Sequence, residues 1–84
     1  MNISRTEQRV LHALAQGGAI RHERRGDAIV FAELITREGY ALGDFNLDIF
    51  ARLRKRKLVE SHDGRPYRIS RAGLGAVRAQ LDNR

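Results

Sequence analysis

The sequence lacks cysteine and tryptophan and contains a single proline and a single methionine. The absence of cysteine excludes a disulfide framework, a thiolate nucleophile and a cysteine-ligated zinc site. No apolar run approaches the roughly 18 residues that a membrane-spanning helix needs, and the first residues show no secretory signal. We therefore expect a soluble cytoplasmic protein without membrane contact.

Acidic residues are few relative to basic ones, with 10 Asp and Glu against 16 Lys and Arg and a net charge of +6. Fourteen of the sixteen basic residues are arginine, which favours bidentate contacts with phosphate or carboxylate groups. Residues 52–78 contain nine basic and two acidic side chains, whereas residues 1–51 contain six and seven. The positive charge therefore belongs to the second half of the chain, and it indicates a nucleic-acid or acidic protein partner.

A chain of 84 residues buries only about 60% of its surface on folding, so we expect one thin core and one domain spanning residues 1–84. The segment Ser4-Arg5-Thr6-Glu7 is a capping box that predicts the start of a helix. Gly17-Gly18 predicts its end, because glycine accepts the left-handed conformation after a last turn. The apolar stripe of this helix is formed by Val10, Leu11 and Leu14.

Two runs at residues 19–25 and 28–35 flank Gly26-Asp27, a pattern typical of a β-hairpin. Residues 28–38 can alternatively form a helix, because a continuous apolar run does not distinguish the two by periodicity. Residues 37–39 are typical of a turn, and Tyr40 and Leu42 alternate after it as a short third strand or an extended loop.

Asn46 predicts the N-cap of a helix that reaches about Arg56, with Phe45 and Phe50 as its hydrophobic staple. The apolar side of this helix consists of Leu47, Ile49, Phe50 and Leu53, and its outward stripe of Asp48, Arg52, Lys55 and Arg56.

A second hairpin is predicted from residues 58–62 and 65–69 around Asp63-Gly64, with Pro66 confining one arm to an edge. Ser70 then caps a final helix whose buried face is formed by Leu74, Val77 and Leu81. Helix, hairpin, helix, wing hairpin and helix together predict an α+β domain that is winged-helix-like. It departs from the usual winged helix, which carries a second helix where we expect the first hairpin.

Several segments carry a family resemblance. They are residues 2–5, 7–9 and 11–12, then Arg37-Glu38-Gly39 and Pro66-Tyr67-Arg68-Ile69, and the final eight residues, VRAQLDNR. Across essentially the whole chain these segments resemble the small bacterial YjhX-like proteins. The resemblance implies a toxin of a toxin–antitoxin pair that inhibits DNA topoisomerase I, with a separate acetyltransferase-like protein as its antitoxin.

The residues expected to bind nucleic acid or a protein partner follow from charge alone. They are Arg52, Arg54, Lys55, Arg56, Lys57, Arg65 and Arg68. The run at 52–57 can instead complement the dipole of a solvated helix end. Arg68 can contact a partner or lie beside Val59 across the hairpin and cover apolar surface. Tyr67 can stack on a base or pack in the core with its hydroxyl at the rim.

The histidines do not predict a metal site, because His12, His22 and His62 fall on separate elements without ligand spacing. We expect His12 to be partly buried and hydrogen-bonded and His62 to be solvated. Asp44 and Asp48 are better explained as a cap and a first-turn acid than as an acid–base pair. We therefore expect no enzyme, no cofactor and no metal.

The sequence supports three hypotheses of function. The first is a toxin that inhibits DNA topoisomerase I by binding the enzyme or its DNA. The second is a winged-helix transcriptional regulator that binds DNA with Arg52, Lys55 and Arg56 facing the groove. The third is an adaptor that forms a homodimer or binds an antitoxin through the apolar face of its first hairpin, near Phe31 and Tyr40.

Overall fold

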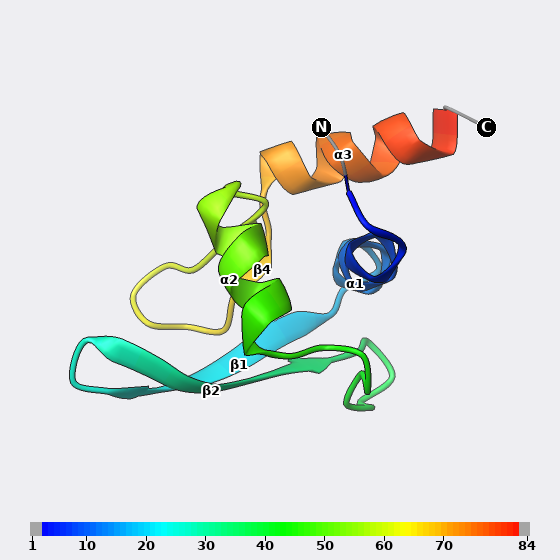
Figure 1. Ribbon diagram of the computed structural model, residues 1–84. Helices are drawn as coiled ribbons and strands as arrows, with labels where there is room; N and C mark the ends of the chain where they lie inside the picture. The colour runs from blue at the N-terminus through cyan, green and yellow to red at the C-terminus, as the bar shows by residue number, and fades with distance from the viewer. Residues whose placement is uncertain (1–2, 83–84) are drawn as a thin grey trace.

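The computed structural model describes the backbone of residues 3–82 and the side chains of residues 3–78. This part of the chain forms three helices and two small antiparallel sheets, which confirms an α+β fold (Figure 1). The elements are α1 (Arg5–Ala15), β1 (Ala19–Arg25), β2 (Ala28–Ile35), α2 (Leu47–Lys55), β3 (Val59–Glu60), β4 (Arg68–Ile69) and α3 (Arg71–Asp82).

Helix α1 begins and ends as its sequence predicts. The backbone N–H of Ser4 donates to Glu7 Oε1 at 2.9 Å, and the backbone N–H of Glu7 donates to Ser4 Oγ at 3.1 Å, which completes the capping box. At the other end, Gly17 N–H donates to the Leu14 carbonyl and Gly18 N–H to the Ala13 carbonyl, both at 3.1 Å. These two bonds form a Schellman motif, with Gly17 at a φ of 115°.

The first hairpin is confirmed, and the alternative of a helix at residues 28–38 is wrong. Strands β1 and β2 pair from Ala19↔Ile35 to Arg25↔Ala28, with a bulge beside Glu23 and Arg24. After it, Thr36 N–H donates to the Tyr40 carbonyl at 2.7 Å, and a single bridge joins Ile35 to Ala41. Residues 40–42 are thus an extended loop and do not form a third strand.

Helix α2 is capped by Asn46, whose side chain accepts a hydrogen bond from Ile49 N–H at 2.9 Å. The rings of Phe45 and Phe50 lie 6.0 Å apart, as a hydrophobic staple requires. Leu47 is 41% exposed, so its predicted place on the buried side is wrong. It is the first residue of the helix, and the buried side is formed by the other three, Ile49, Phe50 and Leu53.

The second hairpin is shorter than predicted, because β3 and β4 contain two residues each. Its turn holds Asp63 and Gly64 at positive φ values of 56° and 74°, as in a tight two-residue turn. Beyond the short ladder, Ile20 and Tyr67 exchange two backbone hydrogen bonds of 2.8 Å, which join β1 to the beginning of β4. The second hairpin, which we call the wing, is therefore held by hydrogen bonds to the first hairpin as well as by its own ladder.

Helix α3 corrects the prediction for the buried face of the last helix. Ser70 Oγ accepts a hydrogen bond from Gly73 N–H at 3.0 Å, which confirms the cap. Leu74, however, is 39% exposed, whereas Gly73 is buried. A Cβ on Gly73 would lie 2.3 Å from the Leu58 carbonyl oxygen, so the helix approaches too closely for any side chain there. Val77 is half-buried, and the side chain of Leu81 lies outside the described side chains.

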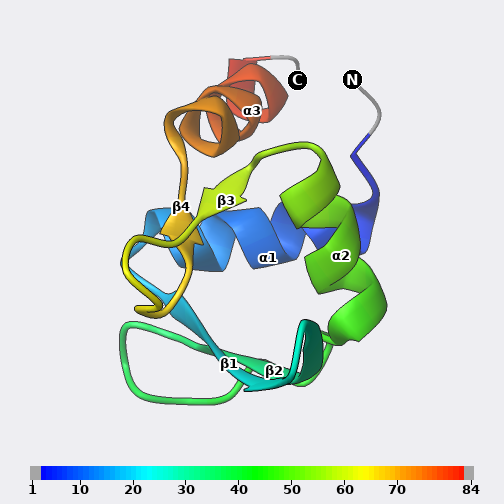
Figure 2. The same ribbon diagram turned by 90° about the vertical axis from the view of Figure 1, so that its left-hand side faces the viewer.

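The three helices lie on one side of the first hairpin (Figure 1 and Figure 2), and α1, α2 and the two hairpins supply most of the buried side chains of one core. Every helix and both hairpins pack against it. Its buried members are Val10, Leu11, Leu14, Ile20, Leu34, Ile49, Phe50, Leu53, Leu58, Val59 and Tyr67.

Candidate partner-binding surface

The seven residues predicted to bind a partner are exposed along the second half of α2, its C-terminal cap and the wing. Arg52, Arg54 and Lys55 lie on α2, Arg56 is its C-cap, and Lys57 follows. Arg65 and Arg68 lie on the second hairpin, which the chain enters directly from the end of α2 (Figure 2). We call these seven residues the basic surface.

Arg54 is held on aromatic rings. Its guanidinium carbon lies 5.4 Å from the centroid of Phe50 and 5.7 Å from that of Tyr67, which is within cation–π range. Tyr67 itself is buried, and its ring meets Phe50 edge-on at 4.9 Å and His22 at 5.1 Å. Of the two alternatives for Tyr67, the structure therefore supports core packing.

Arg56 is placed by a buried carboxylate at the start of α1. Glu7 is 2% exposed, and its Oε1 lies 3.8 Å from Arg56 Nη1. Burial alone would raise the pKa of Glu7, but the hydrogen bonds from Ser4 and the positive charges of Arg56 and Arg52 lower it below its ordinary value. Glu7 therefore carries a negative charge under the end of α2.

Arg68 has a partner that the sequence did not indicate. Its Nη1 donates to the Gly17 carbonyl at 3.1 Å and so satisfies an acceptor at the end of α1. Arg68 pairs across the ladder with Glu60, and Val59 pairs with Ile69. The alternative that placed Arg68 beside Val59 is wrong.

Lys57 adopts a backbone conformation that non-glycine residues rarely take. Its φ is 59°, and it closes α2 with a Schellman motif in which Lys57 N–H donates to Arg54 and Leu58 N–H to Leu53, both at 2.9 Å. Its carbonyl accepts a 2.7 Å hydrogen bond from Ser70 Oγ, so the cap is also tied to α3. A left-handed residue with a Cβ costs about 1–2 kcal/mol, and α2 keeps a lysine there nonetheless.

The remaining cations of the basic surface, Arg52, Lys55 and Arg65, make no ion pair with any residue in the described part of the chain. A hollow of about 280 Å³ on the wing lies between Glu60, His62, Arg65, Pro66 and Arg68. The structure thus divides the basic surface into three anchored side chains (Arg54, Arg56 and Arg68) and four exposed side chains without an ion pair in the described part of the chain (Arg52, Lys55, Lys57 and Arg65), of which Lys57 is held by its backbone alone.

Of the histidines, His62 is exposed on the wing beside Arg65, as predicted. The prediction of a partly buried His12 is wrong, because its side chain is exposed, but its ring nitrogen Nε2 lies 3.3 Å from Gln16 Nε2, so the predicted hydrogen bond is present. Asp44 forms an ion pair with Arg9 and does not cap α2. Among the described residues, no three His, Asp or Glu side chains gather as a metal site would require, and none of the described helices is long and apolar enough to cross a membrane.

Comparison with known proteins agrees with the resemblance carried by the sequence. Residues 1–84 match the model of the YjhX toxin family, described as "Putative toxin of bacterial toxin-antitoxin pair", and the chain belongs to this family. The chain is similar to a UPF0386 protein of Brucella anthropi, with 58% identity over 84 residues and full coverage of both chains.

A UPF0386 protein of Parvibaculum lavamentivorans is 59% identical over 85 residues, again with full coverage of both chains. A UPF0386 protein of Caulobacter vibrioides is 53% identical over 85 residues, which cover all of this chain and 93% of that relative. No solved structure matches the chain.

Proposed function

We propose that this member of the toxin family inhibits DNA topoisomerase I by binding, with the basic surface as its contact and no chemical step of its own. The anchoring of Arg54, Arg56 and Arg68 carries the proposal. A solvated helix end needs no such support, whereas side chains ordered before binding lose less entropy when a partner arrives. The target itself follows from the family resemblance, and the cytoplasm is the compartment that this target implies.

The family resemblance gives the enzyme as the target, which favours contact with an acidic surface of the enzyme over coverage of DNA. All seven cations of the basic surface are exposed. Neutralising about seven phosphates would give a salt exponent of about −6, so charge alone permits either mode. The two modes differ in stoichiometry: a protein that covers DNA must be present in enough copies to coat it, whereas a docked inhibitor acts near one copy per enzyme.

The decisive experiment is relaxation of supercoiled DNA by purified topoisomerase I, with the protein titrated at two DNA concentrations about tenfold apart. We expect the inhibiting dose to follow the enzyme concentration and to ignore the DNA concentration. A dose that rises with DNA would assign the inhibition to coating of DNA. No inhibition at any soluble dose would refute the proposal.

Charge reversal then localises the contact. We expect Arg52→Glu with Lys55→Glu to raise the inhibiting dose at least about tenfold, as loss of close charge pairs does at other interfaces. The matched control is Arg24→Glu with Arg25→Glu, which makes the same charge change at the exposed tip of the first hairpin. Equal loss in both variants would show that net charge matters and that the basic surface does not.

A second candidate, a winged-helix DNA-binding regulator, is supported by the two hydrogen bonds between Ile20 and Tyr67. They attach the wing to β1, as the strand arrangement of such a domain requires. The first hairpin occupies the place where a winged helix carries its second helix, which weakens this alternative. Protection of one short duplex sequence over others would favour it.

The adaptor hypothesis remains as a third possibility for the first hairpin. Phe31 is 44% and Tyr40 72% exposed, so apolar surface is available there for a homodimer or an antitoxin. It predicts that substitution of either residue weakens association while charge reversal on the basic surface does not.

A further inference from the structure

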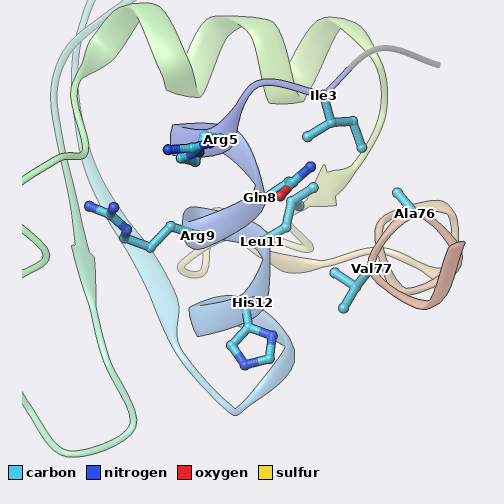
Figure 3. A pocket seen from close by; sticks show the side chains of 8 residues that line it. All are labelled: Ile3, Arg5, Gln8, Arg9, Leu11, His12, Ala76 and Val77. Atoms are coloured by element: carbon cyan, nitrogen blue, oxygen red, sulfur yellow. The ribbon is translucent and has the colours of Figure 1, made fainter. Parts of the chain in front are cut away.

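A second hollow lies away from the basic surface, between α1 and the middle of α3 (Figure 3). It has a volume of about 400 Å³. Its apolar lining comes from Ile3, Leu11, Ala76 and Val77, and its polar lining from Arg5, Gln8, Arg9 and His12. We call it the α1–α3 groove.

The polar lining follows one stripe of α1. Arg5, Arg9 and His12 are separated by four and three residues, so they succeed one another turn by turn along about 10 Å of helix. Figure 3 shows Gln8 and Leu11 on the side of α1 toward α3, His12 at one end of the stripe, and Arg9 extending from α1 on the side away from α3. Among the described residues that line the groove there is no acidic side chain.

The stripe already binds a carboxylate within the molecule, because Arg9 Nη1 forms an ion pair with Asp44 Oδ2. Both side chains are about half exposed, so a competing acidic group can reach the arginine. The other N–H groups of Arg9 can donate hydrogen bonds to a second carboxylate. An apolar floor beside two arginines one turn apart complements a helix with apolar residues on one face and acids along its flank.

We propose that the α1–α3 groove is the docking site for an acidic amphipathic helix of the antitoxin. The proposal rests on the family's toxin–antitoxin pairing, and it does not depend on topoisomerase I as the target. Apolar side chains of the partner helix fill the space over Ile3 and Val77, and its acids pair with Arg5 and Arg9. The antitoxin thereby meets elements other than α2 and the wing.

The test uses the full chain and a synthetic amphipathic peptide of about 18 residues, long enough to form a helix, with leucines on one face and glutamates along the flank. A matched peptide carries lysine in place of each glutamate. Affinity is measured by fluorescence anisotropy, and the site is located by chemical shifts of the Ile3 and Val77 methyl groups. We expect the acidic peptide alone to bind and to shift both methyl groups.

Charge-reversal variants of the protein distinguish binding in this groove from non-specific electrostatic attraction. We expect Arg5→Glu with Arg9→Glu to weaken the acidic peptide by about tenfold or more, and the matched Arg24→Glu with Arg25→Glu to weaken it less than about twofold. His12→Glu, a single exposed change on the same stripe, should weaken it by about threefold even if the double variant unfolds.

Four outcomes would overturn the proposal: no binding of the acidic peptide, equal binding of the lysine peptide, shifts centred on α2, or equal loss in the hairpin control. Inhibition of topoisomerase I is measured separately on the same variants. Arg5→Glu with Arg9→Glu should leave that inhibition unchanged, so failure of one proposal is distinguishable from failure of the other.

Discussion

Helices α1 and α2 end in the same backbone motif but with different residues at its left-handed position. In each, the two residues after the C-cap donate hydrogen bonds back to the last turn, at 3.1 Å in α1 and 2.9 Å in α2. Glycine takes the left-handed position in α1, as Gly17 with a φ of 115°, whereas Lys57 takes it in α2 with a φ of 59°. Glycine adopts this conformation without strain, and lysine does not.

The two helix ends differ in what the left-handed residue contributes, which is stability in α1 and a positive charge in α2. The end of α1 lies where Arg68 binds the Gly17 carbonyl, and nothing there requires a side chain. The end of α2 lies within the basic surface, and a cation is retained where glycine would be more stable. A stable fold and an outward row of cations are therefore competing demands at this one residue.

A tightly packed glycine also lies against each of these two helix ends. A Cβ on Gly18 would lie 2.9 Å from the Ala13 oxygen and 3.1 Å from the Ile35 oxygen. A Cβ on Gly73, which packs over the end of α2, would lie 2.3 Å from the Leu58 oxygen. The second contact is the tighter of the two, and it brings the largest predicted effect.

Gly73→Ala should destabilise the protein by about 2–3 kcal/mol, because the new methyl group overlaps a backbone oxygen that cannot move without shifting β3. For a domain of this size that corresponds to a fall in Tm of roughly 10–20 °C. The matched control is Gly75→Ala, where a Cβ meets nothing within 4 Å. Alanine there should stabilise α3 by up to about 1 kcal/mol. Similar results for the two variants in thermal unfolding would contradict the close approach of α3 to Leu58.

Glu7→Gln should lower the free energy of unfolding at neutral pH by about 1 kcal/mol, because it removes the charge that joins the start of α1 to the end of α2. The folded-state pKa of Glu7 lies below its ordinary value of 4.5. Its contribution is therefore present above that value and is lost as the pH falls through the folded-state pKa.

Urea unfolding at neutral and at acidic pH measures this effect. The difference between the wild type and Glu7→Gln should shrink toward acidic pH. Glu38→Gln, at an exposed position, is the control and should show little difference at either pH. A gap for Glu7→Gln that stays constant with pH would refute the role of the carboxylate charge.

Exchanging the two cap residues should give small effects of opposite sign. Gly17→Lys should destabilise by about 1 kcal/mol, and Lys57→Gly should stabilise by about 0.5–1 kcal/mol, since each reverses the strain at the left-handed position. Both are measured by thermal unfolding. Lys57→Gly should also raise the dose needed to inhibit topoisomerase I; a variant that is more stable and inhibits equally well would show that the charge at this cap has no role in binding.

Those parts of the fold that depend on neighbouring residues could be predicted from the sequence. The Ser4–Glu7 capping box, the Asn46 cap and the Asp63-Gly64 turn each involve residues within four positions, and all three are present. Both hairpins and the order of elements followed from these signals. The length of the wing strands did not, because only two residue pairs form the ladder and Tyr67 exchanges its backbone hydrogen bonds with the distant Ile20.

For the basic surface, the sequence identified which residues are cationic but not which are anchored. Arg54 lies one helical turn after Phe50, so its contact with that ring was a signal within the sequence. The contact of Arg56 with Glu7 and that of Arg68 with Gly17 join residues far apart in the chain, and no local pattern indicates them. The burial of Gly73 in place of Leu74 was missed for the same reason.

The hydrogen bonds between Ile20 and Tyr67 have a consequence for the order of folding. They join distant positions, so a long loop must close before either bond forms, and that closure carries an entropic cost. Strands of two residues are too short to persist alone, so we expect the wing to form after α1 and the first hairpin and to open before them. The hairpin that carries Arg65 is thus held by a strand from the opposite half of the chain.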